Sequence, residues 1–184
     1  VQGFLTLTHL RTLNISYCNL YDSQVIQMVQ QLRNHPSLEA LHLGGNDCVS
    51  SVSVDHIADW LSSKSCRLTD LNLRALWIAY TDDGLLQRRV DLSTLYKAIG
   101  ACHTLRRLVL SENYLEDVDI QLLSTSLRKV RAISHLDVGD NPFSEKGAAQ
   151  LLHLVKAHSS LESIRFENAY VPYLSSEAIR IQAS

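Results

Sequence analysis

The chain has 184 residues, of which 17 are basic and 19 acidic, so its formal net charge at pH 7 is −2. A balanced charge of this kind gives no general attraction to nucleic acid or to an anionic membrane surface. No run of about 18 apolar residues occurs, so the sequence predicts no membrane span. The chain begins at Val1 without a secretory signal pattern, and we expect it to be a fragment of a longer polypeptide.

One eleven-residue pattern recurs along the chain, and its clearest copy runs from Leu105 to Leu115. That copy reads Leu-x-x-Leu-x-Leu-x-x-Asn-x-Leu, and related copies begin at residues 10, 38, 68, 105, 133 and 161. Successive starts differ by 28, 30, 37, 28 and 28 residues. We number the positions within each copy as slots one to eleven. Self-similarity at a nearly constant period predicts a solenoid, in which each repeat contacts mainly its neighbours.

Each copy is predicted to contain a short strand. The apolar residues at slots one, four and six are expected to point into the interior, whereas slots three and five face the opposite side. Slot nine is expected to form a ladder of side chains that hydrogen-bond the loop backbone. Its fitting members are Cys18, Asn46, Asn113 and Asn141. Leu76 and Ala169 do not fit slot nine, so the ladder is expected to break in the third and sixth copies.

A helix is predicted between successive copies, because apolar residues recur there with helical spacing. The expected helices span residues 22–34, 54–61, 91–101, 117–130 and 144–157, and another is expected at 175–181. The residues expected to be buried on these helices are Val25, Ile26, Val29, Leu32, Ile57, Trp60, Leu61, Leu92, Leu95, Ile99, Val118, Leu122, Leu123, Leu127, Val130, Ala148, Leu151, Leu152 and Val155. Serine or aspartate residues near several of the helix starts are placed to cap them.

A strand and a full helix within about 28 residues resemble the ribonuclease-inhibitor-like subfamily of leucine-rich repeats. The resemblance covers Phe4 to Ile181 and depends on six registered copies. It implies an α/β leucine-rich-repeat solenoid of horseshoe shape, with a parallel sheet on the concave face and helices on the convex face. We expect one domain over residues 1–184, with both ends covered by further repeats or another subunit. The long third spacing predicts an insertion at about residues 79–90.

The sequence contains no convergent set of catalytic groups. His42 and His135 are expected on the concave face three strands apart, which at about 4.8 Å per strand is too far to share a metal ion. His35 and His158 stand three residues before a copy, where they are expected to bond the backbone of a helix-to-strand turn. No nucleophile-elbow, zinc-protease or phosphate-loop motif occurs. We therefore expect neither enzyme activity nor a cofactor.

Four cysteines, Cys18, Cys48, Cys66 and Cys102, show no Cys-x-x-Cys spacing. We therefore expect neither a metal site nor a redox pair, and interpret all four as small buried residues with free thiols. Free thiols favour a reducing compartment, so an intracellular and cytoplasmic location is expected.

Two surfaces are candidates for binding a protein. The concave face mixes both charges, and its candidate residues are Arg107, His135, Asp137 and Arg165. The second surface combines slot ten, the insertion and the tail, and its candidate residues are Trp77, Tyr80, Tyr114, Tyr170, Tyr173, Arg88 and Arg89. Trp77 and Tyr114 share slot ten of neighbouring repeats and are expected to lie side by side. The structural alternatives are a solvated sheet face and rings that merely cover the next loop.

The leading functional interpretation is a non-catalytic scaffold that binds a protein partner, because solenoids present extended surfaces. Relatives with the same long repeat suggest alternatives. One is a GTPase-activating array of the Ran-activator type, with Arg74 at slot seven as the candidate arginine. Others are an actin-regulatory array like tropomodulin, a cytoskeletal or ciliary subunit, and the sensing region of a nucleotide-binding immune receptor. No motif in the sequence separates these last alternatives, and a nucleic-acid partner is not expected.

Overall fold

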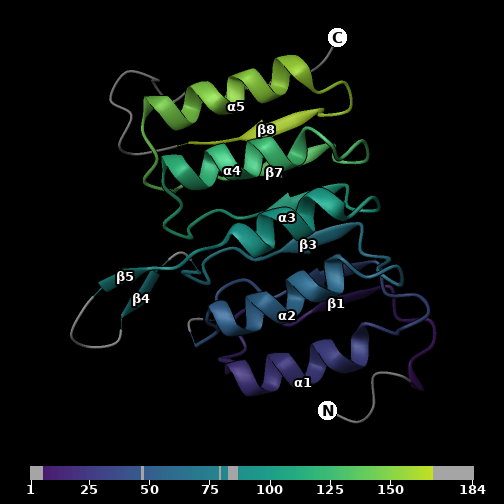
Figure 1. The fold of residues 1–184 in the computed structure, drawn as a ribbon. Helices are drawn as coiled ribbons and strands as arrows, with labels where there is room; N and C mark the ends of the chain where they lie inside the picture. The colour runs from purple at the N-terminus through teal and green to yellow at the C-terminus, as the bar shows by residue number, and fades with distance from the viewer. Residues whose placement is uncertain (1–5, 47, 79, 83–86, 168–184) are drawn as a thin grey trace.

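A computed structural model describes residues 6–46, 48–78, 80–82 and 87–167 of the chain (Figure 1). Within these residues, six parallel strands form one open sheet in the order β1-β2-β3-β6-β7-β8. The strands are Thr12–Asn14 (β1), Ala40–His42 (β2), Asp70–Asn72 (β3), Arg107–Val109 (β6), His135–Asp137 (β7) and Ser163–Arg165 (β8). Each strand belongs to one coil of a solenoid, and we number the coils one to six along the sheet.

The register of the sheet follows the sequence pattern. Slot-four residues pair directly across every strand boundary, from Leu13 with Leu41 in the first pair to Leu136 with Ile164 in the last. Leu71 and its neighbours in the middle of the array are fully buried at this slot. Matching slots therefore stack, as the repeat predicts, and the apolar residues of slots one, four and six form one continuous core.

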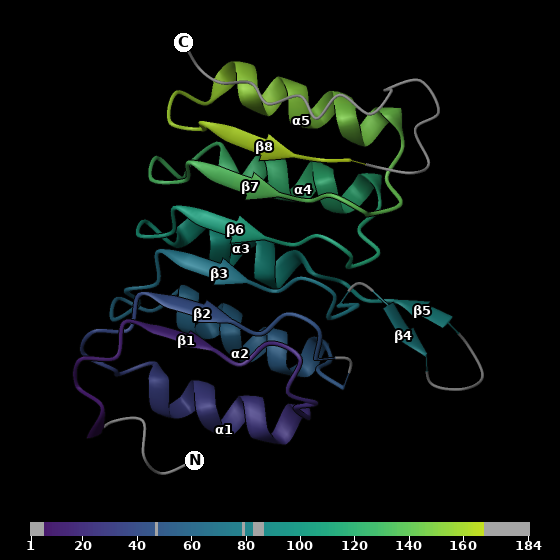
Figure 2. The same cartoon turned by 180° about the vertical axis from the view of Figure 1, so that it is seen from behind.

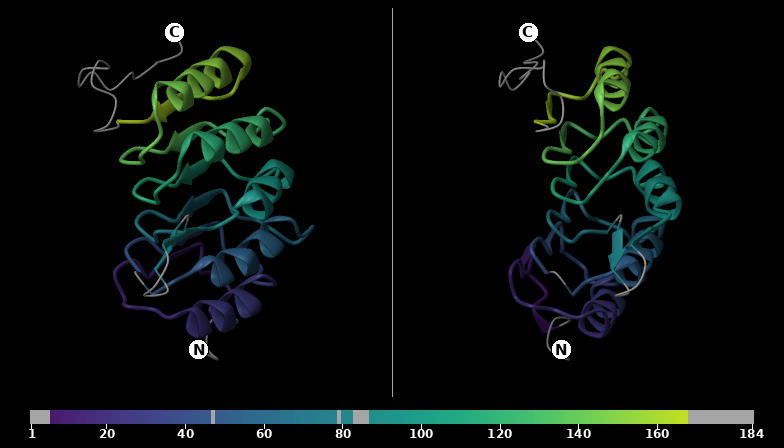
Figure 3. Two further views of the ribbon diagram at one scale, coloured as in Figure 1. Left: turned by 60° about the vertical axis from the view of Figure 1, so that its left-hand side comes forward. Right: turned by 90° about the vertical axis from the view of Figure 1, so that its left-hand side faces the viewer.

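Helices cover one face of this sheet. They are Asp22–Leu32 (α1), Ser51–Leu61 (α2), Ser93–Ala101 (α3), Asp117–Leu127 (α4) and Glu145–Ala157 (α5). In side view, the stacked coils form a shallow arc, with the helices on its outer side and the sheet on its inner side (Figure 3). A parallel sheet requires such crossover connections, because the chain must return to the same end of the sheet before each new strand begins. The predicted α/β leucine-rich-repeat solenoid, with a concave sheet and convex helices, is confirmed.

Several helix details differ from the predictions. Helix α2 begins at Ser51, three residues earlier than predicted, because the Ser50 hydroxyl caps it by accepting a hydrogen bond from the Val52 N–H. Val118 and Leu122 of α4 were predicted to be buried but are 40% and 38% exposed. Ile120 is buried instead, together with the correctly predicted Leu123 and Leu127, because α4 packs between α3 and α5 and those neighbours set its orientation.

Smaller deviations occur on the end helices. On α1, Ile26 is half-buried whereas Met28 is buried, and on α5, Leu154 is buried in place of Leu152 and Val155, which are half-buried. These helices have a neighbouring helix on one side only within the described residues, so their apolar stripe turns toward that side.

Histidines connect successive coils at the turns that precede the strands. His35 Nε2 lies 3.1 Å from the Leu7 carbonyl oxygen, and His158 Nε2 lies 2.8 Å from the Val130 carbonyl oxygen. Both rings thus bond the backbone of the preceding coil, as predicted for turn histidines.

The predicted insertion segment contains a short hairpin between β3 and α3. Its strands are Tyr80–Asp82 (β4) and Gln87–Arg89 (β5), and they pair antiparallel. The hairpin projects sideways from the coil stack at the edge where the sheet strands end (Figure 2). The helix predicted at 175–181 lies outside the described residues.

Candidate protein interface

The loops that follow the sheet strands contain repeated left-handed residues. At slot eight, φ is positive in five coils, at Tyr17, Gly45, Ala75, Glu112 and Asp140. At slot ten, φ is positive at Asn19 (49°), Trp77 (54°) and Tyr114 (59°). A non-glycine residue in this region costs roughly 1–2 kcal/mol, because Cβ approaches the following carbonyl oxygen. The two large aromatic residues therefore occupy a backbone conformation that their own side chains disfavour.

A ladder of buried asparagines at slot nine holds these loops in place. Asn141 Nδ2 donates hydrogen bonds to the carbonyl oxygens of Leu110 (3.0 Å) and Val138 (2.9 Å). Asn46 Nδ2 donates likewise to the Ile15 carbonyl oxygen at 3.0 Å. The ladder predicted from the sequence is confirmed for Asn46, Asn113 and Asn141, which are all buried. Cys18, at slot nine of the first coil, is exposed, and its Sγ lies 3.4 Å from the Ser16 carbonyl oxygen.

Each ladder asparagine also brackets the slot-ten residue of the preceding coil. Asn141 Oδ1 accepts the N–H groups of Asn113 (2.8 Å) and Leu115 (3.0 Å), which flank Tyr114. Asn113 Oδ1 accepts the N–H of Leu76 at 3.0 Å, on one side of Trp77, and lies 3.5 Å from the Ile78 nitrogen on the other. Both aromatic residues are therefore fixed by backbone clamps on either side.

The predicted break in the ladder occurs at Leu76, which is buried and has no side-chain oxygen. In the second, fourth and fifth coils, the slot-nine asparagine supplies the acceptor for the preceding loop, whereas Leu76 supplies none to the loop of the second coil. The loop concerned runs from Asn46 to Val49 and is closed by a turn bond from the Val49 N–H to the Asn46 carbonyl oxygen. Cys48 lies in this loop and is exposed. The predicted break at Ala169 lies outside the described residues.

Trp77 and Tyr114 are in contact, as predicted from their shared slot. Their ring centroids are 6.2 Å apart and the ring planes cross at 76°, an edge-to-face arrangement. Such contacts stabilise an aromatic pair beyond the area that it buries. The two residues nevertheless remain 48% and 47% exposed, so about half of their surface stays open to solvent. We call this pair the aromatic edge.

The other candidates of the second surface are described only in part. Tyr80 lies in β4, and Arg88 and Arg89 lie in β5, where Tyr80 pairs with Arg89. Strand β4 begins three residues after Trp77, so the hairpin starts close in sequence to the aromatic edge. Tyr170 and Tyr173 lie outside the described residues.

The concave-face candidates are held in ion pairs across the strands. Arg107 Nη1 lies 3.4 Å from Asp70 Oδ2, and the same carboxylate oxygen lies 3.4 Å from His42 Nε2. Arg165 Nη1 lies 3.2 Å from Asp137 Oδ2 on the neighbouring strand. Burial opposes the charged form of Arg165, but the charges and hydrogen bonds of Asp137 and Glu167 together outweigh it and raise the pKa of Arg165. The charged groups of this face therefore neutralise one another.

Two residues of the concave face behave differently from the rest. Val109, at slot five, was expected to face solvent but is buried, because Asn72 and Asp137 flank it on the paired strands. His135 is exposed, and its Nδ1 lies 2.7 Å from the Ser134 hydroxyl. Side chains of the neighbouring strands therefore cover part of the concave face at Val109.

Arg74, the candidate arginine of the Ran-activator interpretation, has a partner in the next coil. Its Nε donates a hydrogen bond to Glu112 Oε1 at 2.8 Å, and this bond raises the pKa of Arg74. Both side chains are exposed, so the ion pair is worth little energy and its geometry is easily changed.

Two exposed aromatic residues of the first coil, Tyr17 and Tyr21, were not among the predicted site residues. Tyr17, at slot eight of the first coil, is exposed, and its ring covers Gly45 of the second coil. A Cβ at Gly45 would lie 2.2 Å from the Tyr17 ring, and φ at Gly45 is +67°, so only glycine fits both constraints. The signal in the sequence was the glycine at a slot that holds larger residues in the other coils.

The cysteine predictions were partly wrong. Cys18 and Cys48 are exposed rather than buried, since both lie in the loops after the strands. Cys66 and Cys102 are buried, and their sulfurs lie 3.9 Å apart although 36 positions separate them in the chain. Sequence spacing alone could not bring these two together, because the insertion lies between them.

The described residues contain neither a metal-binding cluster nor a membrane-spanning helix. No cluster of three or more histidine, cysteine or acidic side chains suited to a metal ion occurs among them. None of the helices in that part of the chain has both the length and the apolar character needed to cross a bilayer.

Comparison with known proteins supports the repeat assignment. Residues 6–23 match the model of a family described as Leucine Rich repeat. Among solved structures, "Leiomodin-1 Actin-Binding Site 2 (ABS2)" aligns with 79% of this chain and 61% of its own, at 12% identity and a TM-score of 0.44. This chain thus spans less than two thirds of that structure's length. No curated protein matches this chain. With matched slots stacked in one parallel sheet, the described residues have the fold of an α/β leucine-rich-repeat solenoid.

Proposed function

We propose that this chain is a non-catalytic scaffold whose protein partner docks on the aromatic edge, Trp77 and Tyr114. The observation that carries the proposal is that two half-exposed rings are held in mutual contact on clamped, left-handed backbone. Tryptophan and tyrosine are enriched among the residues that contribute most to protein interfaces. The fold does not need a large side chain at these two exposed positions. The backbone strain at Trp77 and Tyr114 therefore points to a role in binding.

The clamps bear directly on affinity. A partner that orders a mobile loop loses part of its binding energy to conformational entropy, whereas a rigid loop avoids that loss. The N–H groups on either side of Tyr114 are bonded to Asn141, which is itself buried. The aromatic edge therefore presents apolar area in a fixed geometry, which favours tight and selective docking.

The concave face supports a partner less well. Its arginines already pair with Asp70 and Asp137, so a partner would exchange existing ion pairs for new ones with little net gain. We assign Arg107, His135, Asp137 and Arg165 a secondary role, in which they orient a partner whose main contact is the aromatic edge.

The repeat subfamily and the ends of the array belong to the same proposal. The full helices of α1 to α5 and the spacings of 28 residues support ribonuclease-inhibitor-like repeats. The half-buried Leu13 and Ile15 of the first coil support a neighbour that covers that end, either further repeats or another subunit. The actin-regulatory, ciliary, immune-receptor and GTPase-activating alternatives differ in the partner, and identification of that partner separates them.

The experiment compares two double variants of the full-length protein as bait. Trp77→Ala with Tyr114→Ala removes the aromatic edge. Val118→Ala with Leu122→Ala removes two apolar side chains of similar exposure from the outward side of α4. Proteins captured by the unmodified bait are identified by mass spectrometry, and each is then purified and titrated by calorimetry against all three forms.

The proposal predicts one partner whose Kd rises at least about tenfold for the aromatic-edge variant and stays unchanged for the α4 variant. Circular dichroism of both variants must match that of the unmodified chain. A partner that binds the aromatic-edge variant with unchanged affinity contradicts the proposed site.

A further inference from the structure

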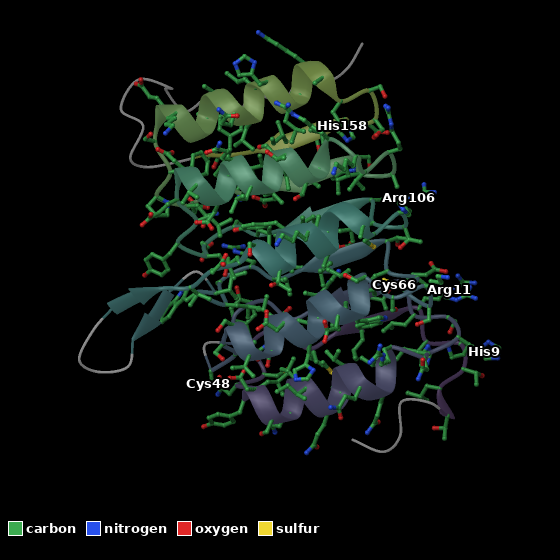
Figure 4. The ribbon with its side chains drawn as sticks, viewed as in Figure 1. His9, Arg11, Cys48, Cys66, Arg106 and His158 are labelled. Atoms are coloured by element: carbon green, nitrogen blue, oxygen red, sulfur yellow. The ribbon has the colours of Figure 1, made fainter. Side chains whose placement is uncertain are left out.

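Cys66 and Cys102 form a buried pair at the turns that precede β3 and β6. Their sulfurs are 3.9 Å apart, within hydrogen-bonding range for thiols. Cys102 is 2% exposed and Cys66 is 9% exposed, so a narrow part of the pair reaches the surface at Cys66. Figure 4 shows Cys66 on the side of the solenoid away from the β4–β5 hairpin, so the pair is separate from the aromatic edge.

The slot that Cys102 occupies is one from which side chains reach back to the preceding coil. Three residues before the six copies stand Leu7, His35, Ser65, Cys102, Val130 and His158, of which four carry a polar group or a thiol. His35 contacts the Leu7 carbonyl oxygen, Ser65 donates to the Arg33 carbonyl oxygen at 3.1 Å, and His158 contacts the Val130 carbonyl oxygen. The Cys102 side chain likewise reaches toward the preceding coil, but there it contacts the Cys66 thiol.

The spacing of the two coils suits a disulfide bond. Asp70 pairs with Arg107, and the cysteines lie four residues before Asp70 and five residues before Arg107. Neighbouring strands are about 4.8 Å apart, and a disulfide spans Cα atoms separated by roughly 4.4–6.8 Å. The sulfurs need to approach by about 1.9 Å to reach bonding distance, which side-chain rotation at exposed turns can supply.

We propose that Cys66 and Cys102 are a redox-modification site that closes reversibly into a disulfide, linking the third coil to the fourth. The proposal corrects the expectation of four inert thiols and does not depend on the proposed partner site. Buried cysteines that serve only as apolar filling have no need to lie within contact of each other, and in the fifth copy Val130 fills the slot of Cys102.

The oxidant required is a small hydroperoxide. The hydrogen bond from the Cys66 thiol lowers the pKa of the Cys102 thiol, so the Cys102 thiolate attacks a peroxide oxygen and the O–O bond breaks. With hydrogen peroxide this gives a sulfenic acid at Cys102 and hydroxide, which takes up the proton that the Cys102 thiol released and leaves as one water molecule. The Cys66 sulfur then attacks the sulfenic sulfur, and its proton leaves with the hydroxyl group as a second water molecule. A dithiol reductant returns two electrons and two protons to restore both thiols.

The bond would link the two coils on either side of the insertion. It encloses the segment that contains the hairpin and α3, where the spacing between copies is longest. A cross-link over about 36 residues restricts the unfolded chain, so the oxidised form is expected to be more stable. Oxidation would thus fasten the third coil to the fourth.

The test uses the full-length protein with Cys18→Ser and Cys48→Ser, so that the exposed thiols cannot form links between molecules. The protein is treated with hydrogen peroxide while folded, then denatured, and its remaining thiols are counted with a chromogenic disulfide. Proteolysis and mass spectrometry identify the linked peptides. Matched samples carry Cys66→Ser in the same background, with dimedone present to trap sulfenic acid.

The proposal predicts loss of both thiols, a peptide linking Cys66 to Cys102, and a rise in Tm of about 5–10 °C that dithiothreitol reverses. The Cys66→Ser sample is predicted to retain dimedone at Cys102. Should that variant not fold, the linked peptide and the Tm shift of the paired form still decide the question. Two thiols remaining after a dose that oxidises Cys18 and Cys48 in the unmodified chain, or a link that lowers Tm, would overturn the proposal.

Discussion

The side chain of Asn141 holds the backbone around Tyr114. Its Oδ1 accepts the N–H groups of Asn113 and Leu115, the two neighbours of Tyr114, at 2.8 and 3.0 Å. A buried residue of the fifth coil therefore fixes an exposed residue of the fourth. This arrangement ties the stability of the array to the geometry of its candidate interface.

Substitution of Asn141 by alanine tests this link. It leaves the N–H groups of Asn113 and Leu115 and the Leu110 carbonyl oxygen without their partner, and each unsatisfied buried group costs about 1–3 kcal/mol. We expect the free energy of unfolding in urea to fall by about 3 kcal/mol or more.

The matched control for this substitution is Asn14→Ala. Asn14 is exposed, and its Oδ1 accepts only a local bond from the Ser16 N–H at 3.1 Å among the hydrogen bonds described. Its loss is expected to cost less than about 1 kcal/mol. Equal destabilisation by the two substitutions would show that the ladder has no special role.

The left-handed backbone at Trp77 predicts an unusual order of substitutions. Glycine accepts a φ of 54° without strain, whereas alanine does not, so Trp77→Gly should be more stable than Trp77→Ala by about 1 kcal/mol. At Thr125, an exposed position within α4, helix propensity should give the opposite order by a similar amount. Thermal unfolding of the four variants measures both differences, and alanine exceeding glycine at position 77 would contradict the strain.

The middle of the core tests the solenoid itself. Leu108 is fully buried at slot four, so Leu108→Ala should lower the free energy of unfolding by about 2–5 kcal/mol. Leu122→Ala, on the outward side of α4, should change it by less than about 1 kcal/mol. Similar losses at both positions in chemical denaturation would be inconsistent with the stacked interior.

An aspartate network on the helix side predicts a dependence on pH. Asp117 accepts hydrogen bonds from the Ser144 N–H at 2.8 Å and the Gly147 N–H at 3.0 Å, which cap α5. Partial burial opposes ionisation, but a hydrogen bond from the Ser144 hydroxyl, together with these two N–H bonds, outweighs it and lowers the pKa of Asp117 below its usual 3.8. The stabilisation is therefore complete above about pH 4 and is lost as pH falls through the lowered pKa.

Unfolding of Asp117→Asn at pH 7 and pH 3 measures this contribution. The variant should lose less stability on acidification than the unmodified chain, because it lacks the carboxylate that protonates. Asp55→Asn, which alters an exposed carboxylate on α2, serves as the control. An acid response of Asp117→Asn equal to that of the unmodified chain would show that this capping carboxylate contributes nothing.

The register of the sheet could be predicted from the sequence, because a leucine at slot four has only one face on which it can be buried. Leu71 pairs with Leu108 even though the insertion separates them, since the slots and not the spacing determine the stacking. The contact of Trp77 with Tyr114 followed from the same rule. Where a residue's position depends on its slot alone, prediction succeeded.

Prediction failed where tertiary packing decides between similar local options. Val118 and Ile120 are both apolar residues near the start of α4, and only the position of α3 and α5 determines that Ile120 is buried and Val118 exposed. The approach of Cys66 to Cys102 depended on the path of the chain through the insertion. The clamp around Tyr114 required the hydrogen-bond directions of a side chain in another coil.

The most direct test of the aromatic edge as a docking site is acrylamide quenching of tryptophan fluorescence. The chain has two tryptophans, and Trp60 is only 2% exposed whereas Trp77 is 48% exposed, so quenching of the free protein reports mainly on Trp77. Saturation with a purified, tryptophan-free form of the captured partner should lower the quenching constant to that of a buried tryptophan and shift the emission to shorter wavelength. Unchanged quenching and emission at saturation would show that the partner binds elsewhere.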